Sequence, residues 1–87
     1  MERKIIDFWA PWCGPCKQFA PIFEQVKNEQ NNITFEKVNV DEQESISTNY
    51  KVRGIPTIVF IKDGVEVGRH TGFMSKSVFE QKIKEVF

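Results

Sequence analysis

Residues 7–17 of this chain read DFWAPWCGPCK, from Asp7 to Lys17. This segment holds the only two cysteines, Cys13 and Cys16, at the point where a strand-like apolar run gives way to a helical pattern. A cysteine at the start of a helix and another in its first turn are close enough to form and break a disulfide with little backbone movement. The helix N-terminus also favours a thiolate over a thiol. We therefore expect Cys13 to be the nucleophile of a redox pair.

Two other interpretations of the cysteine pair are a zinc site and a static structural disulfide. A structural zinc ion requires four nitrogen or sulfur ligands, whereas this chain supplies two cysteines and one distant histidine, His70, so a monomer cannot complete the site. A disulfide that closes so short a loop constrains the unfolded chain only weakly. We therefore expect no metal site and a catalytic disulfide.

Length and composition indicate one domain, residues 1–87, with a single core. Lysine plus arginine and aspartate plus glutamate each number 12, so no net positive charge indicates binding to nucleic acid or to an anionic membrane. The N-terminus lacks the apolar region of a signal peptide, and the longest apolar stretch, around Ile58–Ile61, is too short to span a bilayer. We expect a cytoplasmic protein.

Apolar periodicity and turn residues predict an alternation of strands and helices. The predicted elements are a strand at Ile5–Trp9, a helix from Gly14 to about Asn31 with a kink at Pro21, a strand at Ile33–Val40, a short helix at Asp41–Tyr50, a strand at Thr57–Ile61, a hairpin turn at Asp63-Gly64, a strand at Val65–His70 and a final helix after Gly72. Thr57–Ile61 is the most hydrophobic strand and is expected to lie centrally. Ser75 or Ser77 can cap the last helix, and Ser77 with Glu80 fits a capping box.

This βαβαββα order, with Trp-Cys-Gly-Pro-Cys-Lys at the first strand-to-helix junction, closely resembles the thioredoxin family over nearly the whole chain. The resemblance implies an α/β, thioredoxin-like fold with a central mixed four-stranded sheet flanked by helices. One departure is that thioredoxins usually carry a further strand and helix before the first strand seen here, so one sheet edge is expected to be uncovered. The other matching positions are Asp7, Trp9, Pro21, Lys37, the run Val52-Arg53-Gly54-Ile55-Pro56-Thr57, Asp63-Gly64 and Gly72.

The resemblance assigns four catalytic residues. It makes Cys13 the attacking thiolate and Cys16 the resolving thiol, in the order that the helix N-terminus also predicts. Burial of Asp7 in an apolar strand should raise its pKa, which would make it a proton acceptor for Cys16, and Lys37 on a neighbouring strand would lower that pKa again. The alternatives are a salt-bridged or surface-facing Asp7 and a solvated Lys37.

The resemblance also implies a substrate groove across from the cysteines. Ile55-Pro56 resembles the family's cis-proline loop, although an X-Pro bond taken alone is more often trans. The backbone there would pair with an extended substrate segment. For Ile55 and Phe73, ordinary core or loop packing is the alternative. The expected substrate-binding residues are Trp12, Gly14, Pro15, Gly54, Ile55, Pro56, Gly72 and Phe73.

Together these features predict an enzyme, a monomeric thiol-disulfide oxidoreductase that reduces disulfides of substrate proteins without a metal or bound cofactor. By resemblance, a thioredoxin reductase using NADPH would re-reduce it. The same fold serves disulfide-forming oxidants and isomerases, but Gly14-Pro15 carries no ionisable group, which favours reduction. A non-catalytic binding module that docks a partner on the same apolar rim is the alternative from another class.

Overall fold

The computed structural model describes all 87 residues, and its elements follow the predicted order βαβαββα. They are β1 (Arg3–Trp9), α1 (Gly14–Glu29), β2 (Thr34–Asn39), α2 (Glu44–Asn49), β3 (Thr57–Lys62), β4 (Val65–Thr71) and α3 (Lys76–Val86). None of the three helices combines the length and apolar character needed to cross a membrane.

The four strands form one mixed sheet in the order β2-β1-β3-β4. β1 runs parallel to β2 and antiparallel to β3, and β3 runs antiparallel to β4. Every residue of β3 except the last is buried, which confirms the predicted central position of this strand. β2 and β4 are the edge strands, and β2 pairs only with β1.

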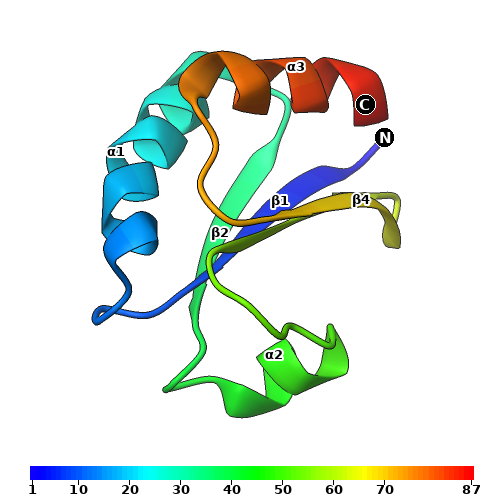
Figure 1. Ribbon diagram of the computed structural model, residues 1–87. Helices are drawn as coiled ribbons and strands as arrows, with labels where there is room; N and C mark the ends of the chain where they lie inside the picture. Colours follow the sequence, from blue (N-terminus) through cyan, green and yellow to red (C-terminus); the bar gives the residue numbers. More distant parts are fainter.

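Helices cover both faces of the sheet, with α1 and α3 on one side and α2 on the other (Figure 1). Successive side chains of a strand point to opposite faces, so Ile5 joins the core under α1 and α3 while Ile6 joins the core near α2. Asp7 has the same parity as Ile5 and therefore points toward the α1 side. The larger core consists of Ile5, Phe19, Phe23, Val26, Ile58, Phe60, Met74, Phe79 and Ile83.

The helix boundaries correct the sequence analysis in three places. α1 ends at Glu29, slightly before the predicted end at about Asn31, and Pro21 lies inside it, as predicted. α2 begins at Glu44 because turns occupy the residues directly after β2. α3 is capped by Ser75, whose hydroxyl accepts a hydrogen bond from the Val78 N–H at 3.3 Å. Ser77 lies inside the helix, so the Ser77–Glu80 capping box was wrong.

The predicted hairpin turn at Asp63-Gly64 joins β3 to β4. Both residues have positive φ, 52° and 83°, as the tight turns that suit twisted hairpins require. Asp63 also binds the start of the chain, because its backbone N–H donates to the Glu2 carbonyl and its carboxylate accepts from the Glu2 N–H, both at 2.8 Å. The turn therefore anchors the segment that leads into β1.

Candidate active site

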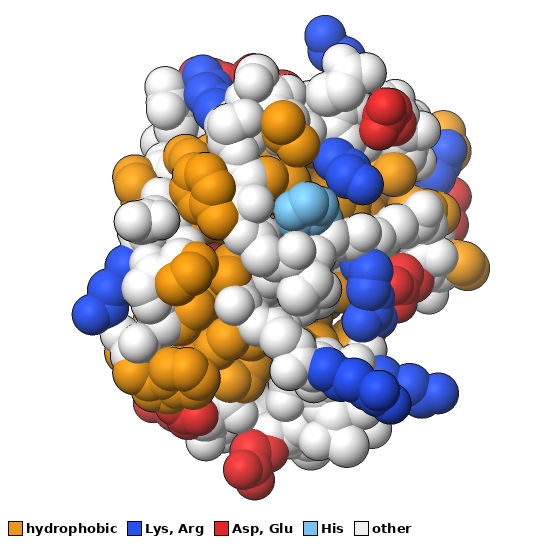
Figure 2. Space-filling model, in the orientation of Figure 1, with side chains coloured by type: hydrophobic (Ala, Val, Ile, Leu, Met, Phe, Trp, Pro, Cys, Tyr) orange, Lys and Arg blue, Asp and Glu red, His pale blue; other side chains and the backbone are white.

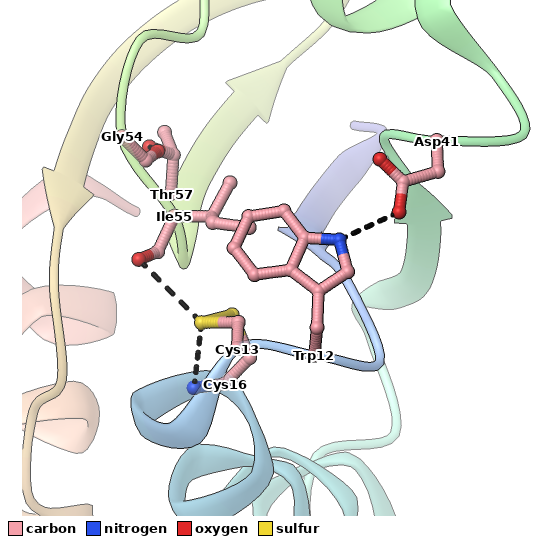
Figure 3. The surroundings of a disulfide bond; sticks show 7 residues. All are labelled: Trp12, Cys13, Cys16, Asp41, Gly54, Ile55 and Thr57. Atoms are coloured by element: carbon pink, nitrogen blue, oxygen red, sulfur yellow. Dashed lines mark hydrogen bonds between the residues drawn. A yellow bond between two sulfur atoms is a disulfide. The ribbon is translucent and has the colours of Figure 1, made fainter.

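Cys13 and Cys16 form a disulfide at the N-terminal end of α1 (Figure 3). Cys13 is the N-cap residue, and its sulfur accepts a hydrogen bond from the Cys16 N–H at 3.2 Å. The two Cα atoms are 5.2 Å apart, which confirms that one helical turn brings the sulfurs within bonding distance. Both residues are buried, with 5% of Cys13 and 3% of Cys16 exposed. Burial therefore does not distinguish them, whereas the N-cap position does.

The loop before β3 faces the disulfide across a short gap. The Ile55 carbonyl oxygen lies 3.7 Å from the Cys13 sulfur, and Figure 3 shows this oxygen pointing toward it. The Ile55–Pro56 peptide bond is cis, as the family resemblance implied. The Gly72 N–H donates to the Pro56 carbonyl at 2.7 Å, which holds the loop after β4 against this segment.

Trp12 stands beside the disulfide with 68% of its surface exposed. Its indole N–H donates to a carboxylate oxygen of Asp41 at 2.7 Å, and Figure 3 shows the ring between the disulfide and Asp41. The ring borders a groove of about 450 Å³ that extends toward α2. The lining residues are Trp12, Val40, Glu44, Ser47, Thr48, Val52, Arg53 and Ile55.

Asp7 is an isolated carboxyl group in the core under α1. Only 1% of the residue is exposed, and neither carboxylate oxygen has a hydrogen-bond partner. Burial raises the pKa of Asp7 from 3.8 to about 7, and the positive charge of Lys37 partly opposes this shift. Asp7 is thus neither surface-facing nor salt-bridged, and it lies on the same side of the sheet as Cys16, which α1 buries.

Lys37 is the register neighbour of Asp7 on β2. Its ammonium group lies 4.7 Å from the centroid of the Trp9 ring, within the range of a cation–π interaction. Lys37 is exposed, and no ion pair forms with Asp7. Its effect on the carboxyl group is therefore a longer-range Coulomb effect.

The other expected substrate residues lie on three separate segments. Gly14 and Pro15 form the exposed first turn of α1, and the space beside Gly14 is open. Gly72 has φ 101°, a conformation that favours glycine, and the next residue, Phe73, is 46% exposed. Gly54 packs closely on β4, because a methyl group added there would lie only 3.1 Å from the side chain of Thr71. Apolar side chains gather on the left of the face in Figure 2, over the N-terminal end of α1.

Sequence reasoning missed Asp41 and the α2 side of the groove. One signal was available, because β1 and β2 are parallel and the segments that follow them leave the same edge of the sheet. Trp12 follows β1 and Asp41 follows β2, so their proximity is a consequence of strand order. No group of three or more His, Cys, Asp or Glu side chains is arranged to hold a metal ion.

Comparisons with known proteins agree on one family. The family model described as Thioredoxin matches residues 1–85. A thioredoxin of Mycoplasma pneumoniae is 47% identical over 84 residues, which cover 97% of this chain and 82% of that protein. A thioredoxin of Mycoplasmoides gallisepticum is 41% identical over 83 residues, covering 95% and 83%. A solved mutant thioredoxin from Halobacterium salinarum is 33% identical with a TM-score of 0.89, covering 98% of this chain and 74% of that one.

Proposed function

This chain belongs to the thioredoxin family of protein-disulfide oxidoreductases, and on that premise we propose that it reduces substrate proteins through Cys13 and Cys16. The Cys13 thiolate attacks one sulfur of a substrate disulfide, forms a mixed disulfide and releases the other substrate sulfur as a thiolate. Cys16 then attacks the Cys13 sulfur and releases the second substrate thiolate. The substrate gains two electrons, and the protein is left with the Cys13–Cys16 disulfide.

The N-cap position of Cys13 carries the assignment of the attacking residue. Its sulfur accepts the Cys16 N–H and lies at the positive end of α1, so negative charge is stabilised there. The Cys16 sulfur lies one turn into the helix and lacks such a donor. Open space beside Gly14 leaves a path for the substrate disulfide.

Asp7 fits the role of proton acceptor for Cys16. Attack by Cys16 requires loss of its thiol proton, and an acceptor works best when its pKa is close to the ambient pH. A pKa of about 7 meets that condition, and the unpartnered oxygens of Asp7 are free to accept. Lys37 limits the rise in the pKa of Asp7 and keeps part of the carboxyl population ionised near neutral pH.

Substrate proteins would bind as extended segments along the loop across from Cys13. The backbone of Gly54, Ile55 and Pro56 offers main-chain hydrogen bonds, which accept many sequences. Exposed aromatic surface at Trp12 and Phe73 provides an apolar rim around the disulfide. Gly14, Pro15 and Gly72 leave that rim open to the substrate chain.

We further propose that the protein works as a cytoplasmic monomer, without a bound cofactor, and that a thioredoxin reductase supplied by NADPH returns it to the dithiol. Gly14 and Pro15 between the cysteines carry no charge that would further stabilise the thiolate. The dithiol is then the electron donor, and reduction of substrates is the favoured direction.

The test is a coupled assay with oxidised protein, NADPH, a thioredoxin reductase and insulin as the disulfide substrate. We expect sustained NADPH consumption by the parent and none by Cys13→Ser. Cys16→Ser should instead accumulate a covalent complex with the substrate, visible by nonreducing electrophoresis. A complex that accumulates with Cys13→Ser and not with Cys16→Ser would reverse the assignment. If Cys13→Ser still supported the function of a partner protein without reducing disulfides, a non-catalytic binding module would be favoured.

A further inference from the structure

The turn that follows α2 holds a lysine in an unfavourable backbone conformation. Lys51 has φ 56°, in the left-handed region that glycine usually occupies at the end of a helix. Its N–H donates to the Thr48 carbonyl at 2.9 Å and the Val52 N–H donates to the Ser47 carbonyl at 3.0 Å, the two hydrogen bonds of a Schellman motif. A side chain in this conformation persists only when surrounding contacts impose it.

Arg69 on β4 supplies a contact of that kind. Its Nη2 donates to the carbonyl oxygen of Tyr50, the C-cap residue of α2, at 2.8 Å. The same guanidinium donates to both carboxylate oxygens of Glu66, through Nε at 2.6 Å and Nη2 at 2.9 Å, so its plane is fixed. A cation at a helix C-terminus is also favoured by the helix dipole. Arg69 therefore links the outer strand of the sheet to the residue that precedes the strained turn.

Side-chain packing is the other restraint on α2. Ile46 and the C-cap residue Tyr50 pack against the buried core on that face of the sheet, where the Tyr50 ring lies 5.5 Å from the Phe8 ring. The helix has six residues, none of them buried, and its N-cap residue Gln43 makes no side-chain hydrogen bond. Such a short helix has little stability of its own. The C-terminal end of this element is therefore held to the sheet by the packed Tyr50 side chain and by the hydrogen bond from Arg69, which acts on the backbone carbonyl of Tyr50.

The turn leads directly into one wall of the groove beside Trp12. Val52, Arg53 and Ile55 line the groove, and the Ile55 carbonyl faces the Cys13 sulfur at 3.7 Å. Lys51 directly precedes Val52, so its backbone sets where this wall begins. At the far end, Pro56 is bound to Gly72, and at the near end Arg69 binds the Tyr50 carbonyl, while Val52 and Ile55 pack on the core between these two points.

We propose that Arg69 is a positioning residue for substrate binding, which fixes the Lys51 turn and thereby the groove wall from Val52 to Ile55. This inference rests on the proposed function, because it concerns how protein substrates reach Cys13. The guanidinium of Arg69 binds Glu66 and Tyr50 and not the sulfurs. It acts through the Tyr50 carbonyl.

The test compares a protein substrate with a small reagent in the variant Arg69→Met, which keeps an unbranched side chain but removes the donors. For insulin we expect KM to rise roughly five- to tenfold with little change in kcat, the effect of one lost hydrogen bond on binding. Reduction of a small aromatic disulfide such as dithionitrobenzoate, which does not need the wall, should keep its rate. The redox potential should also stay at the parent value.

A second variant tests the route of the effect. Glycine adopts the left-handed conformation freely, so Lys51→Gly should let the turn hold without the link to Arg69. In the double variant Arg69→Met with Lys51→Gly, we expect KM for insulin to return to within about twofold of the Lys51→Gly value. Kinetics are measured well below the unfolding midpoint of each variant, so loss of folded protein does not contribute.

Several results would overturn the inference. They are an unchanged KM for insulin in Arg69→Met, equal losses on insulin and on the small reagent, and no restoration by Lys51→Gly. Failure of the proposed function itself would look different, because the parent protein would then reduce neither substrate.

Discussion

Trp12 and Asp41 are joined by a 2.7 Å hydrogen bond between the indole N–H and a carboxylate oxygen, although 29 positions separate them in the sequence. The bond holds a largely exposed aromatic ring against the end of β2. Asp41 itself is oriented by its own N–H, which donates to the Asn39 side chain at 2.9 Å. The ring therefore forms a fixed wall of the groove beside the disulfide.

The first prediction concerns this bond. Asp41→Ala should release the Trp12 ring and raise KM for a protein disulfide by about three- to tenfold, because an ordered binding surface is lost. The matched control is Glu42→Ala, which removes a neighbouring acidic side chain that does not bind the indole. Steady-state kinetics with insulin measure both. An equal rise in KM for the two variants would mean that charge, and not the position of Trp12, is responsible.

A second prediction follows from the buried carboxyl group of Asp7. Its folded pKa of about 7 lies above the unfolded value of 3.8, so ionisation destabilises the folded oxidised protein as pH rises from about 4 to 7. The shift corresponds to a cost of roughly 4 kcal/mol at and above neutral pH. Asp7→Asn should therefore stabilise the oxidised protein by up to that amount near pH 8, less the cost of an unpaired amide, and lose this gain near pH 4.

Urea unfolding of the oxidised parent and variant across this pH range measures the difference in the free energy of unfolding. A difference that stays constant from pH 4 to 8 would show that Asp7 does not titrate in this window. The same variant should slow release of the mixed disulfide near neutral pH, because the proton acceptor is gone.

Lys37 provides the third prediction. Lys37→Met removes the positive charge that opposes the effect of burial, so the pKa of Asp7 should rise above its parent value. The pH dependence of mixed-disulfide release should shift upward with it. Lys4→Met is the control, since Lys4 lies on the opposite face of the sheet and pairs with Glu36 at 3.3 Å. NMR titration of the Asp7 carboxyl carbon reads the pKa directly, and identical values in the three proteins would refute the assignment.

The fourth prediction concerns packing of α3 on β4. A methyl group added at Gly68 would lie 2.9 Å from a methyl carbon of Val86, in the last turn of α3. Gly68→Ala should therefore destabilise the protein by about 1–3 kcal/mol. In a Val86→Ala background the same substitution should cost much less, because the clash is absent. Equal costs in both backgrounds would place the strain elsewhere.

Much of the redox site could be predicted from local sequence. The relation between Cys13 and Cys16 depends on one helical turn, and the geometry of that turn is the same in any fold. The continuous apolar run from Ile5 to Trp9 likewise indicated a buried Asp7, because such a run is typical of a strand buried on both faces. The cis bond before Pro56 was implied by family resemblance only, because the intrinsic preference of an X-Pro bond is trans.

Other features depend on which elements the fold brings together. Of the two candidate caps of α3, the fold uses Ser75 and not Ser77, because the helix begins at Lys76 and encloses Ser77. The pKa of Asp7 depends on α1 excluding water from that face of the sheet. The links from Trp12 to Asp41 and from Arg69 to Tyr50 join segments that are 29 and 19 positions apart.

The sequence by itself thus determined the order of the elements, the redox turn and the apolar faces, because each of these follows from interactions within a few residues of backbone. Only the tertiary structure decided which side chains meet across the groove and how the wall at Lys51 is held. Those contacts depend on strand order and on the placement of α2 and β4, and no local periodicity encodes the distance between two segments that come together only after folding.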